Sequence, residues 1–411
     1  MHLGIFAYDC IPSAGSDPGL GFQSVEMAHS LGHRLHVFTR ASNRAAIEAG
    51  PDLPEATFVY VDVREKIGPA SSGQPHFDVA HIARFLKVAV DQASSIHLAD
   101  PFDLTQHATF SAFWMSGANH RLGVPHLHGP MTGGESNSDA FIPYLSKRER
   151  LDDLVREPLI RTMMRRPAWK KTVSAPHTKS VVASELIKRQ MLAAGAGEVE
   201  VHRSPYAVPP ELRESFAALA AETPKLERPV FVTSGRQLRW KGTHWAVRAL
   251  PRVLAEIPEA TLRIIGGGPN DDAVNADAER LGVTSAVERI TGVDRWEERR
   301  LLAECQALVF PSQRDSGGVI LQFAMALGLP VVGFGVGMAP SILGDAGLLV
   351  DPGSSATPDM ALADAMIEMS TNATARAEMA KAGPARVAGA TSYESSRDAY
   401  ARWIDDLGSR R

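Results

Sequence analysis

Short apolar runs alternate along the chain with longer segments in which apolar residues recur every three or four positions. The short runs are typical of strands buried in a parallel sheet, and the periodic segments are typical of helices packed against it. In the first half, the pattern predicts strands over residues 3–8, 35–39, 57–61, 103–106, 125–128 and 180–183. It predicts helices over residues 23–31, 81–96 and 110–121, and one or two exposed helices over 144–171.

A second and more regular series of the same kind follows after residue 224. It predicts strands over residues 230–233, 261–265, 287–290, 307–310 and 330–332, and helices over 243–255, 272–281, 295–305 and 318–327. Between the two series, the pattern is interrupted by prolines at 205, 209, 210 and 224, and we place the linker there. One more helix, over 393–407, follows the second series, which is complete at about residue 388. The predicted fold class is α/β, with two doubly wound Rossmann-like domains that face a central cleft.

Length and composition agree with two soluble domains and narrow the classes of protein to consider. A chain of 411 residues can form two cores, and 44% hydrophobic and 22% charged residues are ordinary values for a globular protein. The formal net charge of -4 gives no indication of a nucleic-acid partner. The two cysteines, Cys10 and Cys305, are far apart, so a disulfide framework or thiolate metal site is not expected. A reducing, cytoplasmic location fits this cysteine content best.

Neither a secretory signal nor a membrane span is expected from the sequence. Residues 1–8 lack the charged start and the long apolar core of a signal peptide. No uncharged stretch approaches the roughly 20 residues needed to span a bilayer. The segment 148–171 is rich in arginine and lysine and contains Met163, Met164 and Trp169. It suits either peripheral contact with an anionic membrane or a solvated helix face.

The first candidate site is the glycine-rich loop between the first strand and the first helix. The sequence Gly15-Ser-Asp-Pro-Gly-Leu-Gly21 places Gly15, Ser16 and Gly19 where backbone N–H groups can approach an anion at a helix N-terminus. The alternative is a tight strand–helix turn that binds nothing. A dinucleotide-dependent dehydrogenase is disfavoured, because the G-x-G-x-x-G spacing is absent and the second strand ends in Arg40 where an acid is needed.

Two further loops follow strands of the second half. Gly235, Arg236 and Lys241 come after the first of these strands, where an arginine fork and a lysine point charge can reach one diphosphate. For either cation alone, a solvated basic loop is the plainer explanation. Gly266-Gly-Gly-Pro269 closes the next strand and puts Gly267 at the same edge of the sheet, although glycine–proline turns are common.

The most informative segment runs from residue 310 to residue 332. A strand ends, a polar loop with Asp315 and Ser316 follows, and Gly317 and Gly318 open a helix that begins near Val319. Free N–H groups at the start of a helix can bind a phosphate, and a carboxylate beside them can accept hydrogen bonds from sugar hydroxyls. Asp315 can instead be the N-cap of the helix, and the two roles are compatible.

Taken together, these motifs resemble retaining glycosyltransferase family 4, which has the GT-B fold. The resemblance rests on Asp315-Ser-Gly-Gly318, Ala324-Met-Ala326 and Gly328-Leu-Pro-Val-Val332, and on Gly235-Arg236 and Lys241-Gly242, which look like the family's diphosphate clamp. The start of the chain and His128-Gly-Pro-Met-Thr-Gly-Gly-Glu135 look like a subgroup from bacterial polysaccharide and glycoconjugate pathways. The resemblance covers nearly the whole chain. It implies an acceptor-binding domain over 1–205, a nucleotide-sugar-binding domain over 206–388, and a helix over 389–411 that crosses back to the first domain.

Further site residues are implied by this resemblance. A histidine near the donor sugar is expected at the end of a first-domain strand, which points to His128 first and to His107 second. Glu135 is expected to contact the acceptor or the donor sugar, unless it is simply an exposed acid. The implied nucleotide contacts are Gly15, Ser16, Gly19, Gly235, Gly267, Val293, Ser316, Gly317, Gly318 and Val319.

One position departs from the family pattern. The second of two acids with seven residues between them falls on Phe323, which cannot accept hydrogen bonds from a ribose. Phe323 lies four residues from both Val319 and Leu327, a spacing typical of a core-facing stripe. Its polar neighbour Gln322 points about 100° away on an ideal helix. Ribose recognition is therefore expected to differ from that of the family.

The function implied is transfer of a sugar, from a UDP- or GDP-sugar, to a hydroxyl of a saccharide, glycolipid or small metabolite. The resemblance further implies hexosyl transfer, retention of configuration and a grip on the donor that uses no metal, and we expect no other cofactor. The expected catalytic residues are His128, Asp315, Arg236 and Lys241. Two alternatives remain open: a degenerate protein that binds a sugar nucleotide without catalysis, motivated by Phe323, and a sugar-nucleotide epimerase or phosphorylase.

Overall fold

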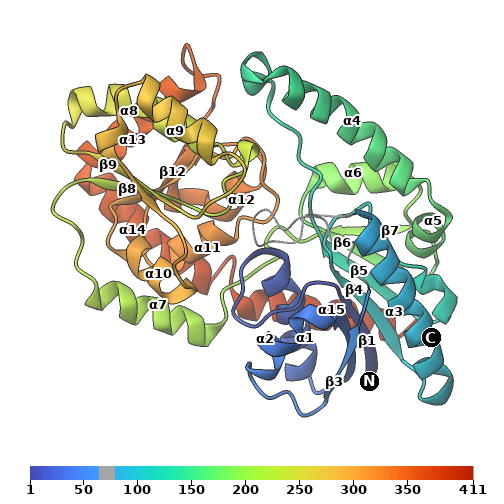
Figure 1. Ribbon diagram of the computed structural model, residues 1–411. Helices are drawn as coiled ribbons and strands as arrows, with labels where there is room; N and C mark the ends of the chain where they lie inside the picture. Colours follow the sequence, from blue (N-terminus) through green and yellow to red (C-terminus); the bar gives the residue numbers. More distant parts are fainter. Residues whose placement is uncertain (64–78, 411) are drawn as a thin grey trace. The chain divides into compact units, whose positions relative to one another are not determined.

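The computed structural model describes residues 1–63 and 79–410, which form two compact units (Figure 1). Unit 1 comprises residues 1–134, 147–206 and 396–411, and unit 2 comprises residues 135–146 and 207–395. The boundaries expected at 205 and 388 lie near two of the points where the chain passes between the units. The excursion of residues 135–146 into unit 2 was not expected from the sequence.

Unit 1 is built on a seven-stranded parallel sheet in the order β3-β2-β1-β4-β5-β6-β7. Its strands are β1 (His2–Ala7), β2 (Arg34–Arg40), β3 (Ala56–Val61), β4 (Leu104–Thr109), β5 (His126–Met131), β6 (Thr178–Val182) and β7 (Glu198–Val201). Every residue of the central strands β1 and β4 is buried, as expected for a parallel sheet covered on both faces.

Helices connect the strands of unit 1 and cover its sheet (Figure 1). They are α1 (Ser16–Ser30), α2 (Arg44–Glu48), α3 (Val79–Ala99), α4 (Lys147–Met164), α5 (Pro167–Val173), α6 (Glu185–Ala193) and most of α15 (Tyr393–Gly408). The last helix is fixed to unit 1 by polar contacts. Arg397 donates to the Oγ of Ser30 at 2.9 Å, and the hydroxyl of Tyr400 donates to the Oε1 of Gln106 at 2.7 Å.

Unit 2 contains a six-stranded parallel sheet in the order β10-β9-β8-β11-β12-β13. Its strands are β8 (Val230–Ser234), β9 (Thr261–Ile265), β10 (Val287–Ile290), β11 (Ala307–Phe310), β12 (Val331–Phe334) and β13 (Gly347–Val350). The helices are α7 (Pro210–Glu222), α8 (Thr243–Glu256), α9 (Asp271–Arg280), α10 (Arg295–Ala303), α11 (Val319–Ala326), α12 (Ala339–Leu343), α13 (Pro358–Thr371) and α14 (Ala373–Ala388). In Figure 1, α8, α9 and α13 lie on one face of this sheet, and α7, α10, α11 and α14 lie on the other. The predicted α/β class with two doubly wound parallel sheets is therefore confirmed.

The segment 135–146 belongs to unit 2 because its aromatic side chains fill the core there. It contains a 3-10 helix, Asp139–Tyr144, in which Phe141 is fully buried. The ring of Phe141 lies 5.7 Å from the ring of Trp245 and 5.1 Å from that of Phe334. Tyr144 packs edge-on against Trp245.

The helix predicted over residues 110–121 is wrong. The segment follows β4 and runs beside the end of β5, where Thr132 donates its N–H to Ser111 and accepts from the N–H of Phe113. These inter-strand bonds replace the bonds of a helix, and a 3-10 helix over Asn119–Leu122 is the only helical turn in the segment. Eight of the described strands and α-helices were not predicted, namely β7, β13, α2, α6, α7, α12, α13 and α14. Within the described ranges, no helix combines the length and the apolar character needed to cross a membrane.

Candidate functional site

The strand order of unit 2 reverses between β8 and β11. The chain continues from β8 to β9 and β10 on one side, and from β11 to β12 and β13 on the other. Loops that leave the carboxyl ends of two such strands diverge to opposite faces of the sheet and leave a crevice, which is where open α/β sheets bind ligands. The loop with the predicted cations follows β8, and the loop with Asp315 follows β11.

The loop after β8 is shaped by glycines that allow close approach to its neighbour. Gly235 has φ 130° and Gly242 has φ 77°, both outside the range that other residues favour. A Cβ atom on Gly242 would lie 1.8 Å from the carbonyl oxygen of Pro311, at the end of β11. The N–H of Gln313 donates to the carbonyl of Trp240 at 2.9 Å. Backbone contacts therefore hold the two loops against each other.

Asp315 is the centre of the hydrogen bonding between these loops. Its Oδ2 accepts from the Nζ of Lys241 at 2.6 Å, and its Oδ1 accepts from the N–H groups of Gly317 at 2.9 Å and Gly318 at 3.1 Å. Gly318, with φ 58°, immediately precedes α11. Asp315 therefore stabilises the turn that leads into α11, but it is not the N-cap weighed from the sequence, because Gly318 occupies that position and no side chain caps the helix. The amides of Gly317 and Gly318, expected to face a phosphate, face this carboxylate.

The charge state of Asp315 follows from the same contacts. The side chain is only 6% exposed, and this burial by itself acts to raise its pKa. The positive charge and hydrogen bond of Lys241, with the amides of Gly317 and Gly318, outweigh burial and hold the pKa of Asp315 below its ordinary value. Asp315 is therefore ionised at neutral pH.

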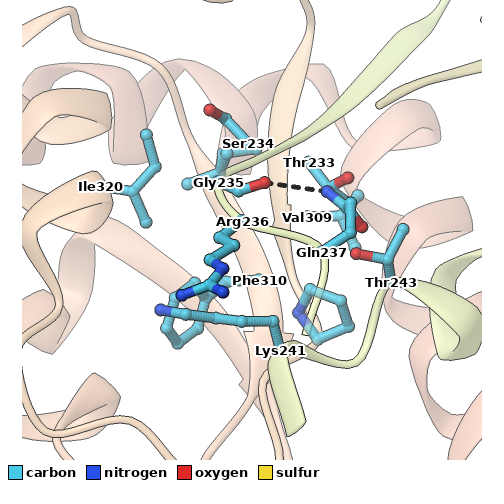
Figure 2. A pocket seen from close by; sticks show the side chains of 12 residues that line it. Thr233, Ser234, Gly235, Arg236, Gln237, Lys241, Thr243, Val309, Phe310 and Ile320 are labelled. Carbon is cyan, nitrogen blue, oxygen red and sulfur yellow. Dashed lines mark hydrogen bonds between the residues drawn. The ribbon is translucent and has the colours of Figure 1, made fainter. Parts of the chain in front are cut away.

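Arg236 and Lys241 line the same pocket, between the end of β8 and the end of β11. Figure 2 shows the guanidinium of Arg236 and the side chain of Lys241 lying together. Ile320, which also lines the pocket, lies to the left of both. Arg236 has no ion-pair partner in the part of the chain that the structure describes, whereas Lys241 has Asp315. Two cations therefore line the pocket and only Lys241 is paired with a carboxylate, so the excess positive charge suits an anionic ligand.

Ile320 brings the start of α11 to this pocket. The N–H groups of Leu321 and Gln322 both bond to the carbonyl of Gly318. A helix leaves its first N–H groups without an intrahelical acceptor, and here these include Val319 and Ile320. These two amides, and not those of Gly317 and Gly318, are the backbone donors at this end of α11.

The remaining predicted nucleotide contacts of unit 2 lie at the carboxyl edge of the same sheet. Gly267 follows β9, and its carbonyl accepts from the N–H of Gln237 at 3.1 Å. Val293 lies between β10 and α10, and Ser316 lies next to Asp315, both partly exposed. The structure contains no ligand that would test these contacts, so their roles stay predictions.

Phe323 faces the interior, as its spacing predicted. The side chain is 8% exposed, and its ring lies edge-on to Phe216 at 5.4 Å. The guanidinium of Arg299, on α10, lies 5.4 Å from the centroid of the Phe323 ring. Gln322 is buried on another side of the helix, where its Oε1 accepts from Thr391. Neither side chain of α11 at these positions replaces the acid of the family pattern.

An acid that the sequence analysis did not select lies close to the pocket. Glu298, in the first turn of α10, accepts a hydrogen bond from the hydroxyl of Ser234, which lines the pocket at the end of β8. In the sequence, Glu298 is one of several charged residues in a polar helix, so no local signal distinguishes it.

In unit 1, the glycines around the start of α1 have a structural explanation. A Cβ atom on Gly19 would lie 2.0 Å from the carbonyl oxygen of Ala14, so α1 packs directly on the preceding loop. Gly15 precedes α1 with extended backbone, and Ser16 adopts φ 58° with an exposed side chain. The loop therefore matches the tight strand–helix turn that was the alternative to an anion site.

His128 and His107 are fully buried in unit 1. The Nε2 of His128 bonds to the carbonyl of Met115 at 3.0 Å, and the Nε2 of His107 bonds to that of Phe110 at 3.2 Å. Burial lowers the pKa of His128 to about 4 and that of His107 to about 3, so both are neutral. In this conformation, neither ring has an exposed atom for a substrate, and their predicted contact with a sugar is not supported.

Glu135 is also buried, with 6% exposure, and it is the first residue of the segment that joins unit 2. It was expected in the first domain as a sugar contact, so its placement corrects that part of the prediction. Within the described ranges, no group of three or more histidine, cysteine, aspartate or glutamate side chains is placed to hold a metal ion.

Comparisons with known proteins show that the chain is similar to glycosyltransferases. Residues 228–372 match the family model described as "Glycosyl transferases group 1". The chain is 26% identical to D-inositol 3-phosphate glycosyltransferase 2 of Catenulispora acidiphila over 97% of this chain and 93% of that protein. It is 32% identical to the GDP-mannose-dependent alpha-(1-6)-phosphatidylinositol monomannoside mannosyltransferase of Mycolicibacterium smegmatis, over 30% of this chain and 35% of that protein.

Solved structures support the fold. Sucrose-phosphate synthase from Thermosynechococcus elongatus superposes with a TM-score of 0.68 and 17% identity, with all of both chains covered. HepE from Anabaena, solved in complex with UDP-glucose, superposes with a TM-score of 0.63 and 17% identity over 99% of this chain and 100% of that one. The fold is therefore GT-B, and the similarities together support a glycosyltransferase.

Proposed function

We propose that the protein is a retaining glycosyltransferase of family 4 that transfers a hexose from a nucleoside diphosphate sugar to a hydroxyl acceptor. The observation that carries the proposal is the joint placement of Arg236 and Lys241 at the strand-order reversal of unit 2. Cations there neutralise the negative charge that develops on a departing diphosphate. The similarity of residues 228–372 to group 1 glycosyltransferases supports a donor of this class, with UDP and GDP as the first bases to test.

Each residue of the site then has a separate task. Arg236 supplies a planar fork and Lys241 a point charge to the phosphates, and the amides of Val319 and Ile320 add neutral donors. Asp315 holds Lys241 and the start of α11 in place. About one of its four lone-pair positions remains available to a hydroxyl of the donor sugar.

Retention of configuration fits a reaction in which the acceptor attacks on the face from which the diphosphate leaves. The bond from the anomeric carbon to the phosphate oxygen breaks, and a bond to the acceptor oxygen forms. The leaving phosphate takes the acceptor's proton, so that no protein base is required. In this proposal the two cations hold the diphosphate without a metal, and the acceptor is a saccharide, a glycolipid or a small metabolite bound by unit 1.

The donor assignment is tested by binding and turnover. UDP, GDP and ADP are screened by thermal shift, because a ligand that binds the native state raises the melting temperature. Transfer or donor hydrolysis is then measured for Arg236→Ala and Lys241→Ala with the matching sugar nucleotide. We expect turnover to fall about 10²- to 10³-fold in each, the effect of removing one donor from a developing anion.

Arg239→Ala is the matched control, since Arg239 lies in the same loop but does not line the pocket. Unchanged turnover in both Arg236→Ala and Lys241→Ala would refute the clamp. Binding of a sugar nucleotide without turnover over a broad acceptor panel would favour the non-catalytic alternative, which the buried Phe323 motivates. Interconversion of the donor without an acceptor, followed by NMR, would favour an epimerase.

A peripheral position at the inner face of the cytoplasmic membrane is a second part of the proposal. It rests on α4, where Leu151, Leu154, Val155 and Leu159 form an exposed apolar stripe, with Leu154 72% exposed. Exposed basic side chains follow at Arg161, Arg165, Arg166, Lys170 and Lys171. This combination is typical of helices that lie on anionic lipid surfaces.

Sedimentation with vesicles tests the membrane contact. We expect the protein to pellet with vesicles that contain phosphatidylglycerol and not with pure phosphatidylcholine. The double variant Leu151→Gln/Leu154→Gln is expected to stay in the supernatant. Equal recovery of the two proteins from both kinds of vesicle would show that α4 is a solvated helix.

A further inference from the structure

A carboxylate lies at the same sheet edge as the two cations of the pocket. Glu298, in the first turn of α10, accepts a hydrogen bond through Oε1 from the hydroxyl of Ser234. Ser234 is the last residue of β8 and lines the pocket together with Arg236 and Lys241. An acid beside a phosphate clamp does not bind phosphate, but it suits a neutral group attached to the phosphates.

The helix that follows β11 cannot supply this acid. Asp315 is engaged by Lys241 and two backbone amides, and Phe323 packs against Phe216 in the interior. Gln322 accepts a hydrogen bond from Thr391 in a buried position. Asp315 therefore keeps only about one free acceptor position, and neither Phe323 nor Gln322 is an acid, so none of these side chains can hold two ribose hydroxyls.

The first turn of α10 lies directly beside the part of α11 that holds Phe323. The guanidinium of Arg299 lies 5.4 Å from the ring centroid of Phe323 and 5.0 Å from that of Phe216. Glu298 precedes Arg299, and its side chain points about 100° away around the helix, toward Ser234. Two adjacent residues of α10 therefore reach both the buried ring of α11 and the edge of the pocket.

We propose that Glu298, held by Ser234, binds the vicinal hydroxyls of the ribose of the nucleoside diphosphate. The inference rests on the proposed function and identifies the part of the donor that α10 recognises. A carboxylate offers about four lone-pair positions, so the bond from Ser234 leaves acceptors for two hydroxyl protons. Acids at the edge of doubly wound sheets hold ribose hydroxyls in this way in dinucleotide-binding proteins. In this proposal α10 supplies the acid that binds the ribose. The neighbouring helix α11 has Phe323 at the position where the family pattern has an acid.

The experiment compares ribose with deoxygenated ribose at fixed base and phosphates. Dissociation constants are measured by calorimetry for UDP, GDP and ADP and for their 2′,3′-dideoxy forms. The wild-type protein is expected to bind the ribose form about ten- to a hundredfold more tightly, the effect of hydrogen bonds to a charged group. In Glu298→Gln this preference is expected to fall to a few-fold, while affinity for the dideoxy form changes little.

Glu298→Gln keeps an amide oxygen for the hydroxyl of Ser234, so the fold is retained, and an unchanged melting temperature verifies this. The matched control is Glu297→Gln, because Glu297 precedes Glu298 but pairs with Arg300. The control is expected to keep the full preference for ribose.

Two outcomes would overturn the inference while the proposed function stands. One is an undiminished ribose preference in Glu298→Gln. The other is an equal loss of affinity for both sugar forms, which would make Glu298 a structural partner of Ser234 alone. Failure of the wild-type protein to bind any of the three nucleoside diphosphates would instead refute the proposed function, and the subsite with it.

Discussion

The start of α1 in unit 1 and the loop before α11 in unit 2 have similar sequences, but the pKa values of their acids are shifted in opposite directions. Asp17 lies in the first turn of α1, where burial raises its pKa to about 6, and its Oδ1 accepts from the N–H of Ser111 at 3.1 Å. Asp315 is buried as well, but its contacts with Lys241 and two amides keep its pKa below the ordinary value. A nearby cation makes the difference between the two acids.

The glycines near the starts of α1 and α11 are also required for different structural reasons. Gly19 and Gly21 allow α1 to pack on the carbonyls of Ala14 and Asp9, which would lie 2.0 Å and 1.9 Å from added Cβ atoms. Gly318 adopts a left-handed conformation and turns its N–H toward Asp315. A glycine-rich strand–helix loop therefore indicates close packing in one unit and a polar turn in the other. Only the second accompanies a pair of cations.

The largest effect is expected from Lys241→Met, which makes the surroundings of Asp315 resemble those of Asp17. The buried carboxylate loses its cation, so the free energy of unfolding at pH 7 should fall by about 3 kcal/mol. The loss should shrink as the pH falls, because burial without the cation raises the pKa of Asp315 in the variant and the protonated carboxyl no longer needs Lys241. Turnover should fall about 10²- to 10³-fold. Urea unfolding and the transfer assay measure these changes, with the exposed Lys171→Met as control, and unchanged stability would contradict the assigned role of the pair.

Gly19→Ala and Gly318→Ala test whether close packing requires the first glycine and a left-handed backbone the second. Gly19→Ala forces a backbone carbonyl to move and should cost about 3 kcal/mol. Gly318→Ala meets only the tip of Ile342, so its cost should be nearer the 1–2 kcal/mol typical of a left-handed residue. Gly32→Ala, with φ 77° and no atom within 4 Å, isolates the backbone cost. If Gly19→Ala is no more destabilising than Gly32→Ala in thermal unfolding, the packing explanation fails.

Acid should destabilise unit 1 through its buried histidines. Because the folded pKa values of His107 and His128 are about 3 and 4, the unfolded chain binds more protons between these values and about 6.5. The free energy of unfolding should therefore fall with decreasing pH, by up to about 1.4 kcal/mol per pH unit for each histidine. His128→Gln keeps a donor for the carbonyl of Met115 but does not titrate. Denaturant titrations from pH 7 to 4 should give a smaller slope for this variant, and an identical slope would argue against a neutral buried His128.

The smallest effect is expected from Asp17→Asn. The raised pKa of Asp17 means that the folded state holds the proton more tightly, so its contribution to stability is complete below about pH 4 and is lost as the pH rises through about 6. The variant should match the wild type at pH 4 and be modestly more stable at pH 8. Melting temperatures at the two pH values measure the difference. A variant that is less stable at pH 8 would show that the carboxylate is stabilised there, as Asp315 is.

The apolar pattern predicted three strands of unit 2 closely and one helix of unit 1 wrongly. In unit 2, the apolar runs predicted β9, β10 and β11 at their observed bounds, because each strand is short, buried and flanked by turn residues. In unit 1, the segment 110–121 has the composition of a helix but bonds to Thr132 beside β5. Local periodicity cannot reveal such a bond, since it depends on where another strand ends.

In the candidate site as well, local sequence indicated some features and gave no sign of others. The residue types in the loops after β8 and β11 indicated a phosphate clamp, because cations and glycines at strand ends have few other uses in combination. The pairing of Lys241 with Asp315 and the commitment of the Gly317 and Gly318 amides to that carboxylate were not evident. The burial of His128 and His107 was missed as well, since a histidine at a strand end looks the same in the sequence whether it is exposed or buried.

The sequence by itself determined the two parallel sheets and the positions of the cationic loops, because these follow from the spacing of apolar residues and the placement of glycine. The prolines of residues 205–224 predicted a linker, but residues 210–222 form the helix α7. The tertiary structure decided which polar groups are already partnered, that residues 135–146 complete the core of unit 2, and that Glu298 lies beside Ser234. These outcomes depend on contacts between residues far apart in the chain. Such contacts are set by packing and burial, which have no local signature in the sequence.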